Sequence, residues 1–153
     1  MNDAERDFLD RAIELAEASG VDGNPPVGAV IALEGEVIAE GRAQTLEPDY
    51  DPGRHAEMQA IERVDTELWE RAGEMTCYST LEPCVMCAGT LLLHGVGRVV
   101  FGASDPEGGA EPMLEHLPPY YDCREIYEWE GPILPDECDP LYRRVEELYG
   151  ELD

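Results

Sequence analysis

The chain has 153 residues, the size of one ordinary domain, and its 43% of hydrophobic residues can bury a core without disulfide bonds. Thirty-five acidic residues stand against 10 basic residues, all arginine, for a net charge of −25. No apolar run approaches the roughly 20 residues of a membrane span, and the acidic N-terminus does not resemble a signal peptide. We therefore expect one cytoplasmic domain over residues 1–153, without membrane contact and without a basic surface for nucleic acid.

The first third of the chain predicts a helix followed by a β-hairpin. Apolar residues at helical spacing predict a helix over 3–19. The run at 27–33 predicts a buried strand, and a turn at 34–35 joins it to an antiparallel strand over 36–42. Residues 43–53 contain two prolines and predict a loop.

The rest of the chain alternates helices with strands. The expected elements are a helix from 55 to about 64, a strand over 75–79, a helix over 83–93, a strand over 98–102, a loop over 103–123, a strand over 125–129 and a helix over 136–149. A hairpin followed by alternating strands and helices predicts an α/β fold, in which helices cover both faces of a mixed sheet.

Two short motifs carry the chemistry. His55 and Glu57 form H-x-E, and Pro83, Cys84 and Cys87 form P-C-x-x-C; this combination is a known signature of zinc deaminases. The two cysteines share one face at the start of a helix, where the helix dipole favours thiolates. Together with His55 they supply three ligands and leave a fourth position open for water, as in catalytic zinc sites. We expect one catalytic Zn²⁺ per chain.

Glu57 is predicted to be the catalytic residue. At a helix N-terminus it can approach the same metal as His55, although the two side chains would diverge in mid-helix. Two thiolates partly neutralise the zinc charge, so the water needs a base to ionise. A carboxylate can take that proton and return it to the ring nitrogen and then to the leaving amine. The predicted reaction is hydrolytic deamination by zinc-activated water, with release of ammonia.

Neither motif is specific when it stands alone. A C-x-x-C can be a redox or structural zinc motif, and H-x-E is common. Their combination in this order, each at a predicted helix start, favours a catalytic centre. The other cysteines and histidines lack motif-like spacing to this set: Cys77, Cys123, Cys138, His94 and His116. We interpret Cys77 as a core residue, and the sequence assigns no role to Cys123 or Cys138.

These residues resemble the cytidine-deaminase-like superfamily, and within it the bacterial tRNA adenosine deaminases and related guanine and cytosine deaminases. The resemblance covers residues 4–150. Its matching segments are Pro26 to Val30, Asp51-Pro52, Thr80 to Gly89, Gly97 to Ala103 and Gly131 to Cys138. It implies a three-layer α/β/α sandwich with a five-stranded sheet, a catalytic zinc and a homodimer. It also implies substrate contacts at Val27, Ala56, Glu82 and Pro83, where backbone groups help to position the base.

Two departures from the resemblance concern the substrate. The family typically has Glu-Gly-Trp-Asn where this chain has Glu40 to Ala43, so the contact of that Asn with the base is lost unless Gln44 replaces it. Residues 149–153 also lack the basic tail that would hold tRNA. Because a missing polar contact changes discrimination by orders of magnitude, we expect a different or repositioned base.

Three hypotheses about function follow. The leading one is deamination of a small nucleobase or nucleoside of cytosine, guanine or adenine type. The alternative is a tRNA-specific adenosine deaminase adapted to high salt, with tRNA as its partner. The third, a zinc-stabilised binding protein without catalysis, is disfavoured by the intact Glu57.

The composition also bears on the environment. Five cysteines, an odd number with two in a C-x-x-C, fit metal binding in a reducing compartment. Acidic residues spread along the whole chain predict a solvated acidic shell around a normal core, which suits very high salt because ions screen self-repulsion. A merely acidic protein of ordinary habitat is the alternative.

Overall fold

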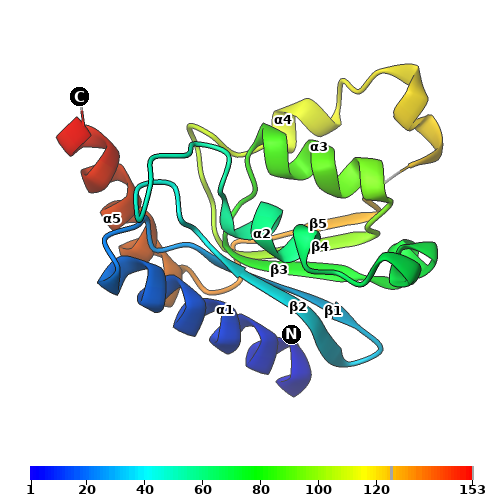
Figure 1. Ribbon diagram of the computed structural model, residues 1–153. Helices are drawn as coiled ribbons and strands as arrows, with labels where there is room; N and C mark the ends of the chain where they lie inside the picture. Colours follow the sequence, from blue (N-terminus) through cyan, green and yellow to red (C-terminus); the bar gives the residue numbers. More distant parts are fainter. Residues whose placement is uncertain (125, 153) are drawn as a thin grey trace.

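A single mixed sheet organises residues 1–124 and 126–152, the part of the chain that the computed structural model describes. Its strand order is β2-β1-β3-β4-β5; β1 is antiparallel to both its neighbours, whereas β3, β4 and β5 run parallel. The strands are β1 (Gly28–Leu33), β2 (Glu36–Arg42), β3 (Thr76–Leu81), β4 (Arg98–Ala103) and β5 (Glu128–Glu130). The expected α/β/α fold with five strands is confirmed, because helices cover both faces of the sheet (Figure 1).

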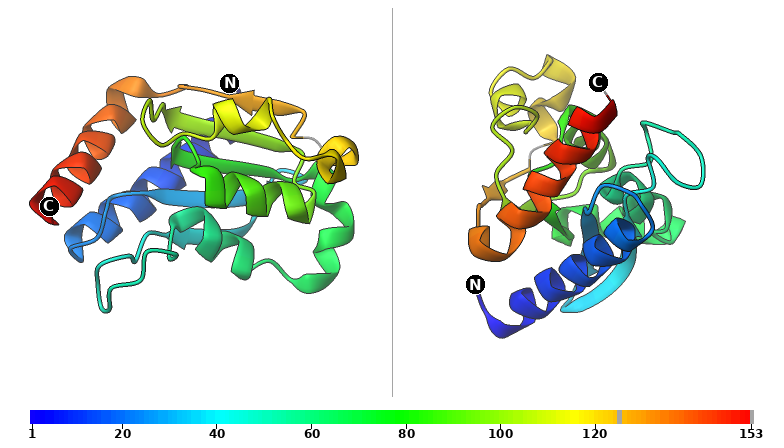
Figure 2. Two further views of the ribbon diagram at one scale, coloured as in Figure 1. Left: turned by 90° about the horizontal axis from the view of Figure 1, so that it is seen from above. Right: turned by 90° about the vertical axis from the view of Figure 1, so that its left-hand side faces the viewer.

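Two layers of helices cover the two faces of the sheet. α1 and the beginning of α5 cover one face of the sheet, and α2 and α3 cover the other (Figures 1 and 2). The helices are α1 (Asp3–Val21), α2 (Ala56–Glu62), α3 (Val85–His94), α4 (Glu111–Leu114) and α5 (Pro135–Leu152), with 3₁₀ segments η1 (Thr66–Glu74) and η2 (Pro119–Cys123). Within the described ranges, no helix combines the length and hydropathy that a membrane span needs.

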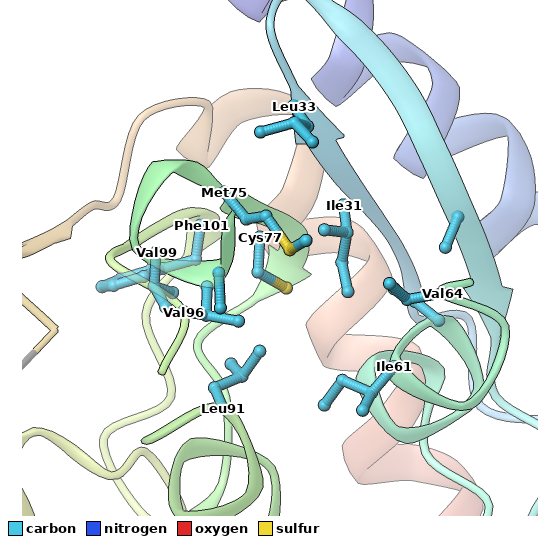
Figure 3. Close-up of a cluster of buried hydrophobic side chains, with 13 residues drawn as sticks. Ile31, Leu33, Ile61, Val64, Met75, Cys77, Leu91, Val96, Val99 and Phe101 are labelled. Carbon is cyan, nitrogen blue, oxygen red and sulfur yellow. The ribbon is translucent and has the colours of Figure 1, made fainter. Parts of the chain in front are cut away.

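Side chains of alternate residues fill the two interfaces of the sheet. Ile31, Cys77 and Val99 point to the α2–α3 face, where they pack with Ile61 and Leu91 (Figure 3). The residues next to them on β1, β3 and β4 pack against α1 instead; these are Val30, Tyr78 and Val100. Cys77 is fully buried, so the structure places this thiol in the core, as expected.

Two predictions about irregular regions need correction, and one further element was not predicted. The strand expected over 125–129 begins later, as β5 at Glu128, where Arg98 holds carboxylates of β5 at the sheet edge; Glu125 lies outside the described residues. The loop at 103–123 contains α4 and η2, and η1 precedes β3. α4 and η2 span only 4 and 5 residues, which is too few to show a hydrophobic period, and η1 is interrupted by a kink at Arg71.

Gly41 on β2 seats α2 directly against the sheet. A Cβ at this residue would stand 2.1 Å from the carbonyl oxygen of Ala56 and 2.6 Å from the amide nitrogen of Ala60. Real Cβ atoms do not approach so closely, so glycine is required for this contact. The start of α2 therefore rests on the backbone of β2.

Candidate zinc centre and active site

The expected metal ligands occupy the starts of two helices. His55 is the N-cap of α2 and Cys84 the N-cap of α3, and both have extended backbones, with ψ of 156° and 177°. Cys87 lies on the first turn of α3. Because an N-cap residue precedes the helical turn, its side chain can point to the same side as a residue inside the first turn.

The ligand atoms form a compact set. His55 Nδ1 lies 3.4 Å from Cys84 Sγ and 3.6 Å from Cys87 Sγ, and the ligand atoms of the three residues lie within 4.8 Å of one another. Tetrahedral zinc, with Zn–S of about 2.3 Å and Zn–N of about 2.0 Å, places such atoms about 3.6 Å apart. The three residues therefore fit zinc in both donor type and spacing.

Electrostatics favour the ligand form of Cys84. A hydrogen bond from Cys87 and the neighbouring His55 lower the pKa of Cys84 to about 4. The hydrogen bond with Cys84 in turn raises the pKa of His55 above its ordinary value. These contacts favour the thiolate of Cys84, which is the form that binds zinc.

Glu57 lies beside this set and is buried. Burial raises the pKa of its carboxyl, against the opposing effects of a hydrogen bond from Cys87, the charge of His55 and a hydrogen bond from Ser79. Ser79 Oγ donates to Glu57 Oε1 at 2.9 Å. Sequence reasoning missed Ser79, although its place two residues after the core residue Cys77 puts it on the same face of β3.

A cavity of about 130 Å³ opens beside the ligands, and three of the five predicted substrate residues line it. These are Val27, Ala56 and Glu82. The carboxylate of Glu82 accepts hydrogen bonds from the backbone N–H of Asp105 at 3.1 Å and from Trp129 Nε1 at 3.4 Å. Glu82 thereby fixes the segment that follows β4.

The other two residues predicted to contact substrate are not among those that line this cavity. Pro83 is fully buried and is not among the residues that line the cavity, and its carbonyl accepts from the N–H of Ala110 at 3.0 Å. Gln44 does not line the cavity either, because its side-chain oxygen accepts from Gln59 Nε2 at 2.6 Å. Thr45, one residue later, faces the cavity instead.

Helix α5 forms a wall that the sequence did not predict. Val145 and Tyr149 line the same cavity as His55 and Cys84, and the hydroxyls of Tyr149 and Thr45 share a hydrogen bond at 3.3 Å. Figure 1 shows the red end of α5 at the same end of the sheet as the loop that leaves β2. Val145 and Tyr149 lie one helical turn apart in the helix expected over 136–149, but the sequence does not show which residues this side of the helix contacts.

A Cys₂His set and a buried carboxylate, brought together by two helix starts at the edge of a mixed sheet, define a zinc-dependent deaminase that hydrolyses C–N bonds. The chain belongs to the cytidine and deoxycytidylate deaminase family, whose zinc-binding region matches residues 2–103.

Two tRNA-specific adenosine deaminases are similar to this chain over most of its length. The tRNA-specific adenosine deaminase of Bacillus subtilis (strain 168) is 39% identical over 134 residues, which cover 86% of this chain and 81% of that protein. The enzyme of the same name from Aquifex aeolicus (strain VF5) is 36% identical over 136 residues, covering 79% of this chain and 87% of that one.

Solved structures give two further likenesses. A structure from a study of tRNA:A34 deaminases superposes with a TM-score of 0.71 and 33% identity, covering 82% of this chain and 98% of that one. Guanine deaminase from Bacillus subtilis superposes with a TM-score of 0.56 and 32% identity, covering 68% of this chain and 66% of that one. Deaminases that differ in substrate thus share this fold.

Proposed function

We propose that this protein hydrolyses the exocyclic C–N bond of an amino-substituted nucleobase, presented as a free base or nucleoside, and releases ammonia. The observation that carries the proposal is the buried carboxylate of Glu57, which lines one cavity together with His55 and Cys84. The intact carboxylate also argues against a binding protein without catalysis. A structural zinc site would need no such group.

The zinc ligands, Glu57 and Ser79 have different roles in this reaction. Zinc, when bound by His55, Cys84 and Cys87, supplies the Lewis acidity that brings the pKa of a water molecule near about 7. Glu57 takes a proton from the attacking water and delivers it to the ring nitrogen next to the reacting carbon. It then carries the second proton to the amine, so that the C–N bond breaks and ammonia leaves while the ring carbon gains a carbonyl oxygen. Ser79 holds Oε1 of Glu57 and so orients the carboxylate for these transfers.

The shape of the cavity supports a small substrate. Its walls are mainly apolar and include Val27 and Val145, which suits the faces of a planar ring. Ala43 stands where family resemblance leads one to expect Asn, and it lines the cavity together with Thr45. These features favour a base or nucleoside that fits in the cavity beside α5.

The names of the relatives support a second candidate, deamination of adenosine in tRNA. The proteins from Bacillus subtilis and Aquifex aeolicus both carry that name. On this reading the anticodon loop would have to enter beneath α5. Assembly as a homodimer and a cytoplasmic location remain predictions for either candidate.

Ammonia release separates the candidates. Zinc-loaded protein in concentrated KCl would be offered cytosine, guanine, adenine, their nucleosides and a tRNA anticodon stem-loop. We expect turnover of a base or nucleoside that disappears in Glu57→Ala while zinc stays bound. Turnover of the stem-loop alone would establish the second candidate, and an active Glu57→Ala variant would refute the role of the carboxylate.

A further inference from the structure

The wall made by α5 is fastened to both loops that frame the cavity. At one end, the hydroxyls of Tyr149 and Thr45 meet at 3.3 Å, which ties the helix to the loop after β2. Nearer the middle of the helix, Tyr142 donates to Asp105 Oδ1 at 2.8 Å, which ties it to the loop after β4. Asp105 is itself held by Glu82, two residues before Cys84. The helix is therefore a fixed part of the site.

The approach to the cavity is acidic. A second hollow, of about 440 Å³, shares Asp105, Val145 and Tyr149 with the cavity and so lies directly outside it. Glu107 and Glu146 add two more carboxylates to its border, and none of the residues that line it is an arginine. A phosphate group that followed this route would meet three like charges without a basic partner, which is unfavourable wherever salt does not screen them.

Thr45 and Tyr149 supply hydroxyls to a part of the cavity where Val27, Ala43 and Val145 are apolar. Thr45 is buried, whereas Tyr149 is 40% exposed and stands at the rim between cavity and approach. Each hydroxyl can donate and accept, so the pair can match either an amino or a keto group on the edge of a ring. A substrate edge that pairs with these hydroxyls would add hydrogen bonds to the one that Thr45 and Tyr149 already share, which raises affinity.

We infer that Thr45 and Tyr149 are specificity-determining residues: they bind the polar edge of the base and, with the acidic approach, restrict turnover to substrates without phosphate. This inference rests on the proposed deaminase function and adds to it the pair of residues that selects the substrate. The zinc ligands and Glu57 perform the reaction on any amino-substituted ring that reaches them. The hydroxyl pair decides which ring does so.

Two conservative variants test the hydroxyls. Thr45→Val and Tyr149→Phe remove one hydroxyl each and keep the shape of the wall. We expect each to raise KM for the preferred base or nucleoside by about tenfold, with kcat and zinc content unchanged. Tyr127→Phe is the matched control, because this tyrosine is exposed and lies outside the cavity. An unchanged KM in both variants would overturn the inference.

A third variant tests the restriction on phosphate. Glu146→Gln removes one of the three carboxylates of the approach, so in dilute salt the ratio of kcat/KM for a nucleoside to that for its 5′-monophosphate should fall about threefold. Because this ratio is measured on one sample, a partly unfolded preparation does not change it. Equal wild-type turnover of nucleoside and nucleotide would overturn the inference and leave the deaminase intact. Turnover of no compound by zinc-loaded protein would overturn the proposed function and this inference with it.

Discussion

The two walls of the cavity are built in different ways. The zinc wall comes from the starts of α2 and α3, whose ligands His55, Cys84 and Cys87 are 29 and 32 residues apart and rest on one sheet. The α5 wall depends on Thr45 and Tyr149, which are 104 residues apart and meet only because α5 crosses the end of the sheet. The reaction is thus encoded by short motifs, and the choice of substrate by a long-range contact.

Loss of a zinc ligand should have the largest effect, because it removes the metal on which the reaction depends. Cys84→Ala is expected to lose all measurable turnover and to bind less than one zinc per chain. Metal analysis and ammonia release measure both effects. The control is Cys123→Ala, since Cys123 is exposed and lies outside the ligand set. Full activity of metal-free protein would contradict the zinc wall altogether.

Removal of the proton carrier should come next. Glu57→Ala is expected to lower kcat by about 10³-fold while zinc remains bound, because general acid–base catalysis contributes about 10²–10⁴-fold. Glu62→Ala, an exposed change on the same helix, should keep the wild-type rate. If Glu57→Ala lost its zinc, the carboxylate would have to be assigned to the metal and not to proton transfer.

A change behind the cavity tests how firmly the segment after β4 is held. A Cβ at Gly109 would stand 2.3 Å from the carboxyl carbon of Glu82, so Gly109→Ala must displace that buried side chain. We expect a loss of about 2 kcal/mol in unfolding free energy and an increased KM. Gly73→Ala, which meets nothing within 4 Å, is the matched control in chemical denaturation. Equal unfolding free energies of the two variants would show that the Glu82 side chain can move at no cost and does not hold the segment after β4 firmly.

Salt should act on the whole surface more than on either wall. Raising KCl from about 0.1 M to about 2 M shortens the screening length from about 10 Å to below about 3 Å and weakens the self-repulsion of a net charge of −25. The melting temperature should therefore rise by several degrees in calorimetry. A flat or falling melting temperature would favour a merely acidic protein over one adapted to high salt.

An ion cluster far from both walls should affect stability alone. Burial raises the pKa of Glu5, but a hydrogen bond and the charge of Arg98, at 2.6 Å, outweigh it and hold the pKa below its ordinary value of 4.5. The carboxylate therefore stabilises the fold above pH 4.5, and this stabilisation is lost as the pH falls through the lowered pKa.

Glu5→Gln tests this cluster with the smallest expected effect. It should lower the unfolding free energy at neutral pH by about 1 kcal/mol and reduce the loss of stability below pH 4.5, with kcat unchanged. Glu14→Gln, at an exposed position on the same helix, should do neither. Acid titrations of unfolding, run beside ammonia assays, distinguish the outcomes.

The sequence predicted the zinc wall closely because each part of it is local. H-x-E and P-C-x-x-C fix which residues can meet at a helix start, and apolar periodicity located both helices to within two residues. The helix expected to start at Pro83 begins two residues later, at Val85, because helix boundaries are the part of a pattern that is least defined.

The α5 wall could not be predicted in the same way. Gln44 and Thr45 are neighbours in a loop without periodicity, so a shift of one residue decides which of them faces the cavity. Tyr149 was visible only as an apolar member of a helix, because its hydroxyl partner lies near the other end of the chain. A hydrogen bond between residues far apart in the chain produces no recognisable pattern in the sequence.

Gly41 gives β2 an unexpected share in catalysis. A methyl group there would push the carbonyl of Ala56, the residue between His55 and Glu57, by about 1 Å, and displacements of that size can slow an enzyme about 10²-fold. In a mutational library of this protein, we therefore expect substitutions of Gly41 to abolish activity without unfolding the chain. These variants would be changed at a residue that contacts neither the metal nor the base. Engineering of a new substrate specificity therefore has to keep glycine at this position.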